Sequence, residues 1–393
     1  MSDTVLVLNS GSSSIKFGLF ELAASGPALL CKGLLDEHEA KPRLLVKSPA
    51  GDDLFATRKE APDADGGHLF AEVLTFIEDR YGERSLRAVG HRIVHGGRDY
   101  SGPVALTDGV IAKLGALTPL APLHQPRCLA PVRALAALRP RLTQIACFDT
   151  AFHHSLAPPA GRFAIPRCYD ERGIRRYGFH GLSFEYVAGR LAEIAPQLVA
   201  KGTVIAHLGN GASLCALRDG RSVDTTMGLT PLDGLVMGTR CGTIDPGVLL
   251  YLQQHEKMSL EDVEHLLYHE SGLFGVSGIS ADMRTLLASG EAAARQAVDL
   301  FTFRAAQQVA MMATTLGGLD CLVFTGGIGE HAKEIRSAIG ERLVWLGVRI
   351  DATANEEARE RISAGGSAVE VFVIPTNEEL TIACHCAAVL RAS

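Results

Sequence analysis

Two segments, about half a chain apart, share one pattern, and that pattern limits how this sequence can fold. In Val5–Lys16, an apolar run leads into a small polar turn and then into a second apolar run. Thr203–Leu217 repeats the arrangement, with Gly209–Ser213 as the turn. Apolar β-forming runs joined by Asn, Gly and Ser predict tight β-hairpins. The repeat therefore indicates an α/β chain built from two related halves.

The first turn is rich in groups that bind anions. Asn9, Gly11 and Ser12–Ser14 let the backbone fold sharply and point N–H groups and hydroxyls at one spot, and Lys16 lies on the returning strand. Such a spot suits a phosphate group. An ordinary surface hairpin accounts for the same residues, so the turn alone leaves both interpretations open. The pattern GxxxxGK[ST] is absent from the sequence, which excludes a P-loop of the usual kind.

Bulk composition narrows the class of protein. A length of 393 residues predicts two or three domains, and 47% hydrophobic residues suffice for their cores. The formal charge of −6 offers no basic surface to nucleic acid, and no apolar run is long enough to cross a bilayer. No secretory signal is visible, and the nine cysteines are scattered, as in reduced cytoplasmic proteins. The Cys384–Cys386 cluster lacks a CxxC partner, so we expect it to be structural.

Hydrophobic periodicity predicts the elements of the first half. Apolar residues at helical spacing predict a helix over 68–80, whereas residues 36–65 show no clear element. A buried strand over Gln144–Phe148 ends at Asp149, and α/β folds place ligand chemistry at the carboxyl ends of strands. The loop-rich stretch Thr150–Gly181 then marks the domain boundary.

The second half contains a third glycine-rich segment. A capping box at Ser259–Asp262 predicts a helix start, and Ala292–Leu316 predicts a long helix that ends at Gly317. A strand over Leu319–Thr325 runs into Gly326–Glu330, which we interpret as a turn. Three turns of this kind favour a nucleotide held between two lobes.

The third segment also supports a rival interpretation. Gly327, Gly329 and Ala332 fit a dinucleotide fingerprint, with Asp351 about 20 residues further on. This pattern is typical of dehydrogenases. A single fingerprint is weak, however, and it leaves the other two turns without a role.

A series of motifs covers nearly the whole chain: Leu8–Lys16, His91–Gly97, Leu120–His124, Phe148–His153, Tyr177–Gly181, His207–Gly211, Met237–Arg240, Phe324–Glu330 and Pro375–Glu379. Through these motifs, which stand in the same order, the chain resembles the acetate kinase family. The resemblance implies duplicated ribonuclease H-like domains with an interlobe nucleotide cleft. It places the N-terminal lobe in residues 1–149 plus 376–393, and the C-terminal lobe, with most nucleotide and dimer contacts, in residues 150–375.

The reaction implied by the resemblance is reversible, in-line transfer of the γ-phosphoryl group of ATP to acetate. The products are acetyl phosphate and ADP, and the metal is Mg²⁺, with Mn²⁺ as an alternative. The resemblance also implies a cytoplasmic homodimer, and we expect no nucleic-acid or membrane partner. Two alternatives stay open: a kinase for propionate or another short-chain acid, and a nucleotide-driven binding protein of the same fold.

The resemblance implies roles for residues at the acid and phosphoryl sites. Arg92 matches the arginine that binds the substrate carboxylate, and a planar guanidinium suits that task. Arg240 and His180 match the pair that contacts the transferred phosphoryl group, and His124 supports the same region. An apolar pocket for the methyl group is implied at Val94, Leu123, Phe179 and Pro231.

The metal site implied by the resemblance contains Asp149, Asn9 and Glu378. Asp149 also matches a catalytic position. Because the attacking group is itself a carboxylate, whose pKa lies several units below 7, no proton needs to be removed from it. We therefore expect Asp149 to organise metal and water.

The nucleotide would be bound by residues from several motifs, and these are Lys16, His207, Leu208, Gly209, Asn210, Gly211, Asp282, Met283, Arg284, Gly326, Gly327, Ile328, Gly329 and Glu330. The sequence departs from the family pattern at a few positions near them, namely Gln125, Leu182, Phe184, Cys241 and Thr243. These departures bear on the positioning of His180 and Arg240, and hence on the preferred acyl chain.

Overall fold

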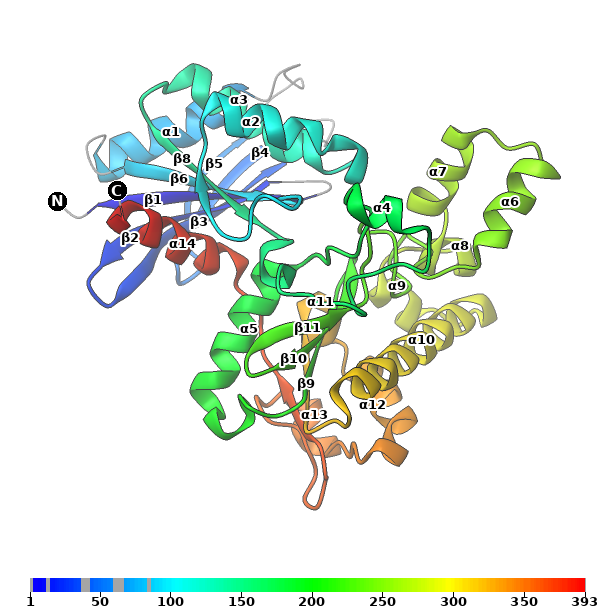
Figure 1. Ribbon diagram of the computed structural model, residues 1–393. Coiled ribbons are helices and arrows are strands. Elements are labelled where there is room, and N and C mark those ends of the chain that lie inside the picture. Colours follow the sequence, from blue (N-terminus) through cyan, green and yellow to red (C-terminus); the bar gives the residue numbers. More distant parts are fainter. Residues whose placement is uncertain (1–2, 12–14, 37–42, 59–66, 83–85, 393) are drawn as a thin grey trace. The chain divides into compact units, whose positions relative to one another are not determined.

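The chain folds into two compact units. The computed structural model describes residues 3–11, 15–36, 43–58, 67–82 and 86–392. One unit comprises Met1–Phe152 with Asn377–Ser393, and the other comprises His153–Thr376 (Figure 1). No helix within the described ranges is long and apolar enough to cross a membrane.

The first unit is built on a mixed sheet in which the strand order is β5-β4-β3-β2-β1-β6-β8-β7. Strands β1, β2 and β3 pair antiparallel, whereas β6 and β8 continue the sheet parallel to β1. The strands of this sheet are β1 (Thr4–Ser10), β2 (Ile15–Ala23), β3 (Gly26–Asp36), β4 (Arg43–Lys47), β5 (Asp53–Arg58), β6 (Leu86–Ile93), β7 (Val104–Ala105) and β8 (Thr143–Phe148).

The second unit repeats the central arrangement with the order β11-β10-β9-β12-β13. Again a meander of antiparallel strands is followed by two strands parallel to the first one. The strands are β9 (Thr203–Leu208), β10 (Ala212–Arg218), β11 (Arg221–Thr225), β12 (Cys321–Thr325) and β13 (Glu370–Val373). Both predicted hairpins and the duplicated ribonuclease H-like fold are therefore confirmed.

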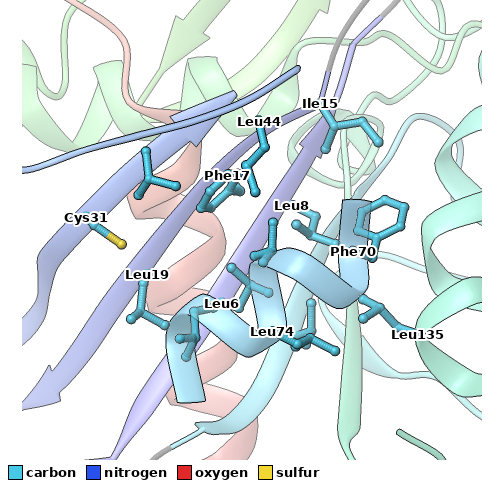
Figure 2. Close-up of a cluster of buried hydrophobic side chains, with 14 residues drawn as sticks. Leu6, Leu8, Ile15, Phe17, Leu19, Cys31, Leu44, Phe70, Leu74 and Leu135 are labelled. Carbon is cyan, nitrogen blue, oxygen red and sulfur yellow. The ribbon is translucent and has the colours of Figure 1, made fainter. Parts of the chain in front are cut away.

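Helices cover both faces of the first sheet. Helix α1 (Gly67–Tyr81) buries Phe70 and Leu74 against Leu6 and Leu8 of β1, as the predicted helical spacing requires (Figure 2). Helix α14 (Glu378–Ala392) returns to this unit and packs on β1 and β6. A Cβ atom at Gly90 would lie 2.5 Å from Cys386 Sγ, so strand and helix approach closely there.

The second sheet is also packed against helices. Helix α10 (Ala292–Leu316) contacts β9, β10 and β11, and it ends at Gly317 in the left-handed conformation, as predicted. The capping box of α7 (Leu260–His269) is confirmed as well. The remaining α-helices are α2 (Asp108–Ala116), α3 (Gln125–Leu138), α4 (Arg167–Glu171), α5 (Gly181–Ile194), α6 (Pro246–Gln254), α8 (Gly272–Ser277), α9 (Met283–Ala288), α11 (Gly326–His331), α12 (Lys333–Arg342) and α13 (Ala352–Glu356).

Two sequence-based expectations about the elements are wrong. Strands β4 and β5 lie in the stretch for which no element was predicted. They are short, and only alternate residues such as Leu44 and Val46 are buried, so their hydrophobic signal is weak. The segment Gly326–Glu330 is not a turn but most of helix α11, because Gly326, at φ +76°, redirects the chain straight from β12 into the helix.

Candidate active site

In the first unit, an arginine and an aspartate form a buried ion pair at the carboxyl ends of neighbouring strands. Arg92 lies near the end of β6, and Asp149 directly follows β8, which is parallel to β6. Arg92 donates from Nε to Asp149 Oδ1 at 3.0 Å and from Nη2 to Oδ2 at 2.6 Å. Asp149 is 1% exposed. The pair is thus a bidentate, charge-assisted contact, which is the strongest kind of side-chain hydrogen bonding.

The end of β1 and the start of α14 add more polar groups. Asn9 donates from Nδ2 to Glu378 Oε2 at 3.0 Å and to Glu379 Oε1 at 2.9 Å. Its Oδ1 accepts a long contact of 3.5 Å from Arg92 Nη1. Asn9 therefore links two carboxylates of the returning helix to the arginine. Lys16 is exposed on β2, and Ser12–Ser14 lie outside the described residues.

Charge and burial oppose each other in this cluster. Burial by itself lowers the pKa of Arg92, but the charges of Asp149 and Glu378 outweigh burial, so the pKa of the guanidinium is raised above its ordinary value. Burial raises the pKa of the Asp149 carboxyl, against the opposing effect of Arg92. The arginine therefore stays charged at every physiological pH.

The described part of the first unit offers carboxylates but no complete cage for a metal. Within the described ranges, no group of three or more His, Cys, Asp and Glu side chains is placed to hold an ion. Magnesium is usually bound by one or two carboxylates, with water and substrate phosphates completing its shell. Asp149 and Glu378 interact electrostatically, and Asn9 contacts Glu378, so this donor set fits Mg²⁺ that arrives with a nucleotide.

The second unit brings the predicted phosphoryl-contacting pair together. Gly211 lies in the turn between β9 and β10, and a Cβ atom there would lie 3.2 Å from both His180 Nε2 and Arg240 Nη2. Arg240 is held by a hydrogen bond from Nη1 to the carbonyl of Pro231 at 2.7 Å. The Nδ1 atom of His180 lies 2.8 Å from Ser213 Oγ. The side chains of Arg240 and His180 thus lie close together at Gly211, which has no side chain and leaves room for a ligand.

A second histidine supports this pair. The ring of His207 stacks on His180 with centroids 4.4 Å apart and an interplanar angle of 22°. Its Nδ1 atom lies 2.8 Å from Ser183 Oγ, in the first turn of α5. His207 was predicted to bind nucleotide, and in the structure its ring packs against the ring of His180.

A cavity of about 620 Å³ in the second unit is bordered by Gly209 and Asn210, which directly precede Gly211. This volume is typical of small-molecule sites. The predicted nucleotide residues that line the cavity are Gly209, Asn210, Asp282, Met283, Arg284, Gly327 and Ile328. Of the other lining residues, sequence reasoning missed Ala281, Leu287, His331 and Glu334, whereas Ala332 was named only in the dinucleotide fingerprint.

Other predicted nucleotide residues have different surroundings. Leu208 is buried, and Glu330 turns inward, where its Oε1 atom accepts from Gly326 N at 2.9 Å and from Thr376 N at 3.1 Å. Glu330 therefore fixes the junction between β12 and α11. Because the predicted segment is helical, His331, the last residue of α11, lies at the cavity, whereas Glu334 reaches it from the first turn of α12. A prediction of helix in place of a turn would have extended the segment to His331.

The residues predicted for the methyl pocket divide between the units. Val94 and Leu123 belong to the first unit, and Phe179 and Pro231 belong to the second. His124 caps α3. Next to it, Gln125 is fully buried and donates from Nε2 to the carbonyls of His95 and Leu114, both at 3.0 Å. This departure from the family pattern is thus a firmly bonded core residue.

The other departures also have defined partners. Thr243 donates to Asp233 Oδ1 at 2.9 Å, and the Cys241 thiol donates to the carbonyl of Gly242 at 3.2 Å. Burial raises the pKa of that thiol. Leu182 and Phe184 are buried in α5.

Two ribonuclease H-like sheets, an arginine–histidine pair at Gly211 and a cavity bordered by the same turn are typical of phosphotransferases. The model of the acetokinase family matches residues 4–384, so the chain belongs to that family. An acetate kinase from Rhodopseudomonas palustris (strain TIE-1) is 53% identical over 391 residues, which is 98% of each chain. This membership rules out the dehydrogenase interpretation, and Asp351 caps α13 instead.

Solved structures agree with the family. A propionate kinase from Francisella tularensis subsp. tularensis SCHU S4 has a TM-score of 0.90 and 38% identity, with 98% of each chain covered. An acetate kinase from Porphyromonas gingivalis has a TM-score of 0.87 and 36% identity, with 99% of this chain and 100% of that chain covered.

Proposed function

We propose that the protein is an acetate kinase, which reversibly transfers the γ-phosphoryl group of ATP to acetate and gives acetyl phosphate and ADP. The observation that carries this proposal is the meeting of His180 and Arg240 over Gly211, in the unit that holds the nucleotide-sized cavity. An arginine N–H and a histidine ring nitrogen aimed at one spot suit the oxygens of a phosphoryl group in transfer.

Arg92 binds the acid in this proposal. Its Nε and Nη2 atoms are committed to Asp149, whereas the contacts that Nη1 makes to described residues are long, 3.3 Å to the carbonyl of Ser10 and 3.5 Å to Asn9. Nη1 is therefore the donor that most readily turns to a substrate carboxylate. Asp149 keeps the guanidinium charged and oriented while it does so.

Asp149, Asn9 and Glu378 would hold Mg²⁺, with Mn²⁺ as an alternative. The metal would neutralise charge on the phosphate oxygens. The carboxylate of the acid attacks without losing a proton, so Asp149 needs no role as a base. We propose further that the protein works in the cytoplasm as a homodimer, with domains at 1–149 plus 376–393 and at 150–375.

A second candidate is a propionate kinase, which the likeness to the solved propionate kinase favours. The two activities would share all charged residues and differ only in the apolar side chains that accommodate the acyl chain, for which we propose Val94, Leu123, Phe179 and Pro231. One methylene group in such a pocket is worth about 1–3 kcal/mol.

Acyl hydroxamate formation tests both candidates. Purified protein is incubated with MgATP, hydroxylamine and acetate, propionate, butyrate or no acid at matched concentrations. We expect the highest kcat/KM with acetate; a higher value with propionate would favour the second candidate. Product without any acid, or none with any acid, would contradict both. The Arg240→Ala variant, purified in the same way, controls for contaminating kinases.

A further inference from the structure

A buried histidine outside the predicted site anchors the backbone next to His180. His153 is 1% exposed, and its Nε2 atom lies 3.0 Å from the carbonyl oxygen of Phe179. On the other side of the ring, Nδ1 lies 2.8 Å from Ser222 Oγ in β11. Because a carbonyl only accepts, Nε2 carries the proton and Nδ1 accepts from the serine hydroxyl. The geometry thus fixes one tautomer of a neutral ring.

The hydrogen bonds around this ring run in one direction. The Cys215 thiol donates to Ser222 Oγ at 3.4 Å, Ser222 donates to His153, and His153 donates to the Phe179 carbonyl. Burial lowers the pKa of His153 to about 4, so the ring stays neutral at neutral pH. The carbonyl of Phe179 is therefore held by a donor that sheet β9–β11 positions.

The backbone held in this way is in an unusual conformation. His180 has φ 60° and ψ 22°, in the left-handed region, which costs a non-glycine residue about 1–2 kcal/mol. Such conformations persist only where surrounding contacts enforce them. Before it, Gly178 has φ +75°, and a Cβ atom there would lie 2.6 Å from His153 Cδ2. The glycine permits His153 to approach the turn.

An aromatic side chain connects His153 to the second histidine of the site. Phe184, which is 0% exposed, meets the ring of His153 edge-on at a centroid distance of 5.5 Å and that of His207 at 6.3 Å. His207 in turn stacks on His180. Edge-to-face packing of this kind fixes ring orientations. Within this cluster, His207 thus packs against the ring of His180, and His153 binds the backbone that precedes it.

We propose that His153 is a positioning residue, which holds the Phe179–His180 turn so that Phe179 faces the acyl group and His180 faces the transferred phosphoryl group. The roles of Phe179 and His180 rest on the proposed function. His153 itself touches neither reacting group. An ordinary core histidine would instead contribute stability alone.

Substitutions at His153 separate these two roles. His153→Phe keeps an aromatic ring without the donor, and His153→Asn is too short to reach the Phe179 carbonyl. His153→Gln places an amide N–H near the position of Nε2. We expect kcat to fall about 10- to 100-fold in the Phe and Asn variants, as for a displaced catalytic group, and to stay within about threefold of wild type in the Gln variant. The Kd for ATP, measured by equilibrium binding, is expected to change less than about twofold.

Two further variants serve as controls. Ser222→Ala removes the partner of Nδ1 and keeps the bond to Phe179, so we expect only a few-fold loss of kcat. Val371→Ala lowers stability from a buried position in β13 of the same unit, away from this cluster. Its kcat, measured well below the unfolding temperature, should match wild type.

The outcomes distinguish this inference from the proposed function. If wild type is active and the Phe and Asn variants turn over at its rate, the positioning role is refuted while the function stands. If the Phe variant fails to fold, the comparison of Asn with Gln decides. If wild type phosphorylates no acid, the function fails, and a crystal structure of the Asn variant decides the inference. A displaced His180 backbone would support positioning, and an unchanged one would refute it.

Discussion

At the scale of single residues, the two arginines of the site have different surroundings. Arg92 is locked to a buried carboxylate, whereas Arg240 is held by a carbonyl. An ion pair orients a guanidinium, but the carboxylate partner cancels part of the positive potential that the arginine presents to a ligand. A carbonyl orients a guanidinium without carrying a full charge of its own. The two arginines are thus oriented by different kinds of group: a buried carboxylate holds Arg92, and a backbone carbonyl holds Nη1 of Arg240.

We expect Arg240→Ala to reduce kcat by about 10³-fold or more, because an arginine at a transferring phosphoryl group is worth that much. Nucleotide affinity should change little, since the cavity is lined by other residues. Arg284→Ala is the matched control: it changes a lining arginine, so the KM for ATP should rise while kcat stays within a few-fold. Near-normal turnover in Arg240→Ala would refute its assigned role.

Buried neutral histidines make stability depend on pH. Burial lowers the pKa of His91 to about 4, and its Nε2 atom lies 2.8 Å from Gln144 Oε1. The unfolded state therefore binds a proton first as pH falls. The neutral, buried His91 therefore stabilises the fold fully above about pH 6.5. This contribution to the free energy of unfolding is lost progressively as the pH falls to about 4, by up to about 3 kcal/mol.

Urea unfolding at several pH values tests this effect. The midpoint of wild type should fall as pH decreases from 7 to 5. In His91→Gln, which cannot titrate, the difference between the two midpoints should be smaller. An equal difference in both proteins would show that other groups cause the acid sensitivity.

At the scale of elements, the junction of β12 and α11 depends on one glycine. Gly326 has φ +76°, and a Cβ atom there would lie 2.8 Å from the carbonyl oxygen of Leu208. The neighbouring Gly327 has no atom within 4 Å of such a Cβ position and no positive φ. Of these two adjacent glycines, Gly326 thus has no room for a side chain, whereas Gly327 does.

We expect Gly326→Ala to lower the free energy of unfolding by about 1–3 kcal/mol and to raise the KM for ATP, because α11 would shift. Gly327→Ala should leave the melting temperature unchanged. Thermal denaturation and ATP kinetics of both variants check this. Equal melting temperatures would mean that the junction tolerates a side chain.

At the scale of the whole molecule, one set of helices carries many exposed apolar side chains. They lie on α6, α8 and α10 of the second unit, and they are Val248, Leu250, Tyr251, Phe274, Val276, Phe303 and Met311. Helices α8 and α10 contact each other. Large apolar patches mark surfaces that bind other proteins. This set is where we place the contact of the proposed homodimer.

We expect wild type to sediment as a dimer and Phe303→Glu to shift the equilibrium toward monomer, because a buried charge at the contact is costly. Phe55→Glu changes a comparably exposed phenylalanine in the first unit and should leave the dimer intact. If Phe303→Glu remains a dimer, the contact between the subunits does not lie on these helices.

The sequence by itself determined the duplication and the elements with strong local patterns. The two hairpins and helix α10 were predictable because alternating or helical spacing and their end residues lie within one short segment. The motifs also singled out His180 and Arg240, whose side chains both lie near Gly211 in the structure. Local sequence carries this information because side-chain periodicity reflects the face that each element buries.

Only the tertiary structure decided which distant residues meet. The bidentate pairing of Arg92 with Asp149 depends on the register of two parallel strands, and the contact of His153 with Phe179 depends on how loops pack on β11. The cavity gathers residues of α9, α11 and α12, such as Arg284, His331 and Glu334. Such contacts join residues far apart in sequence, and their geometry follows from packing, which no short segment encodes.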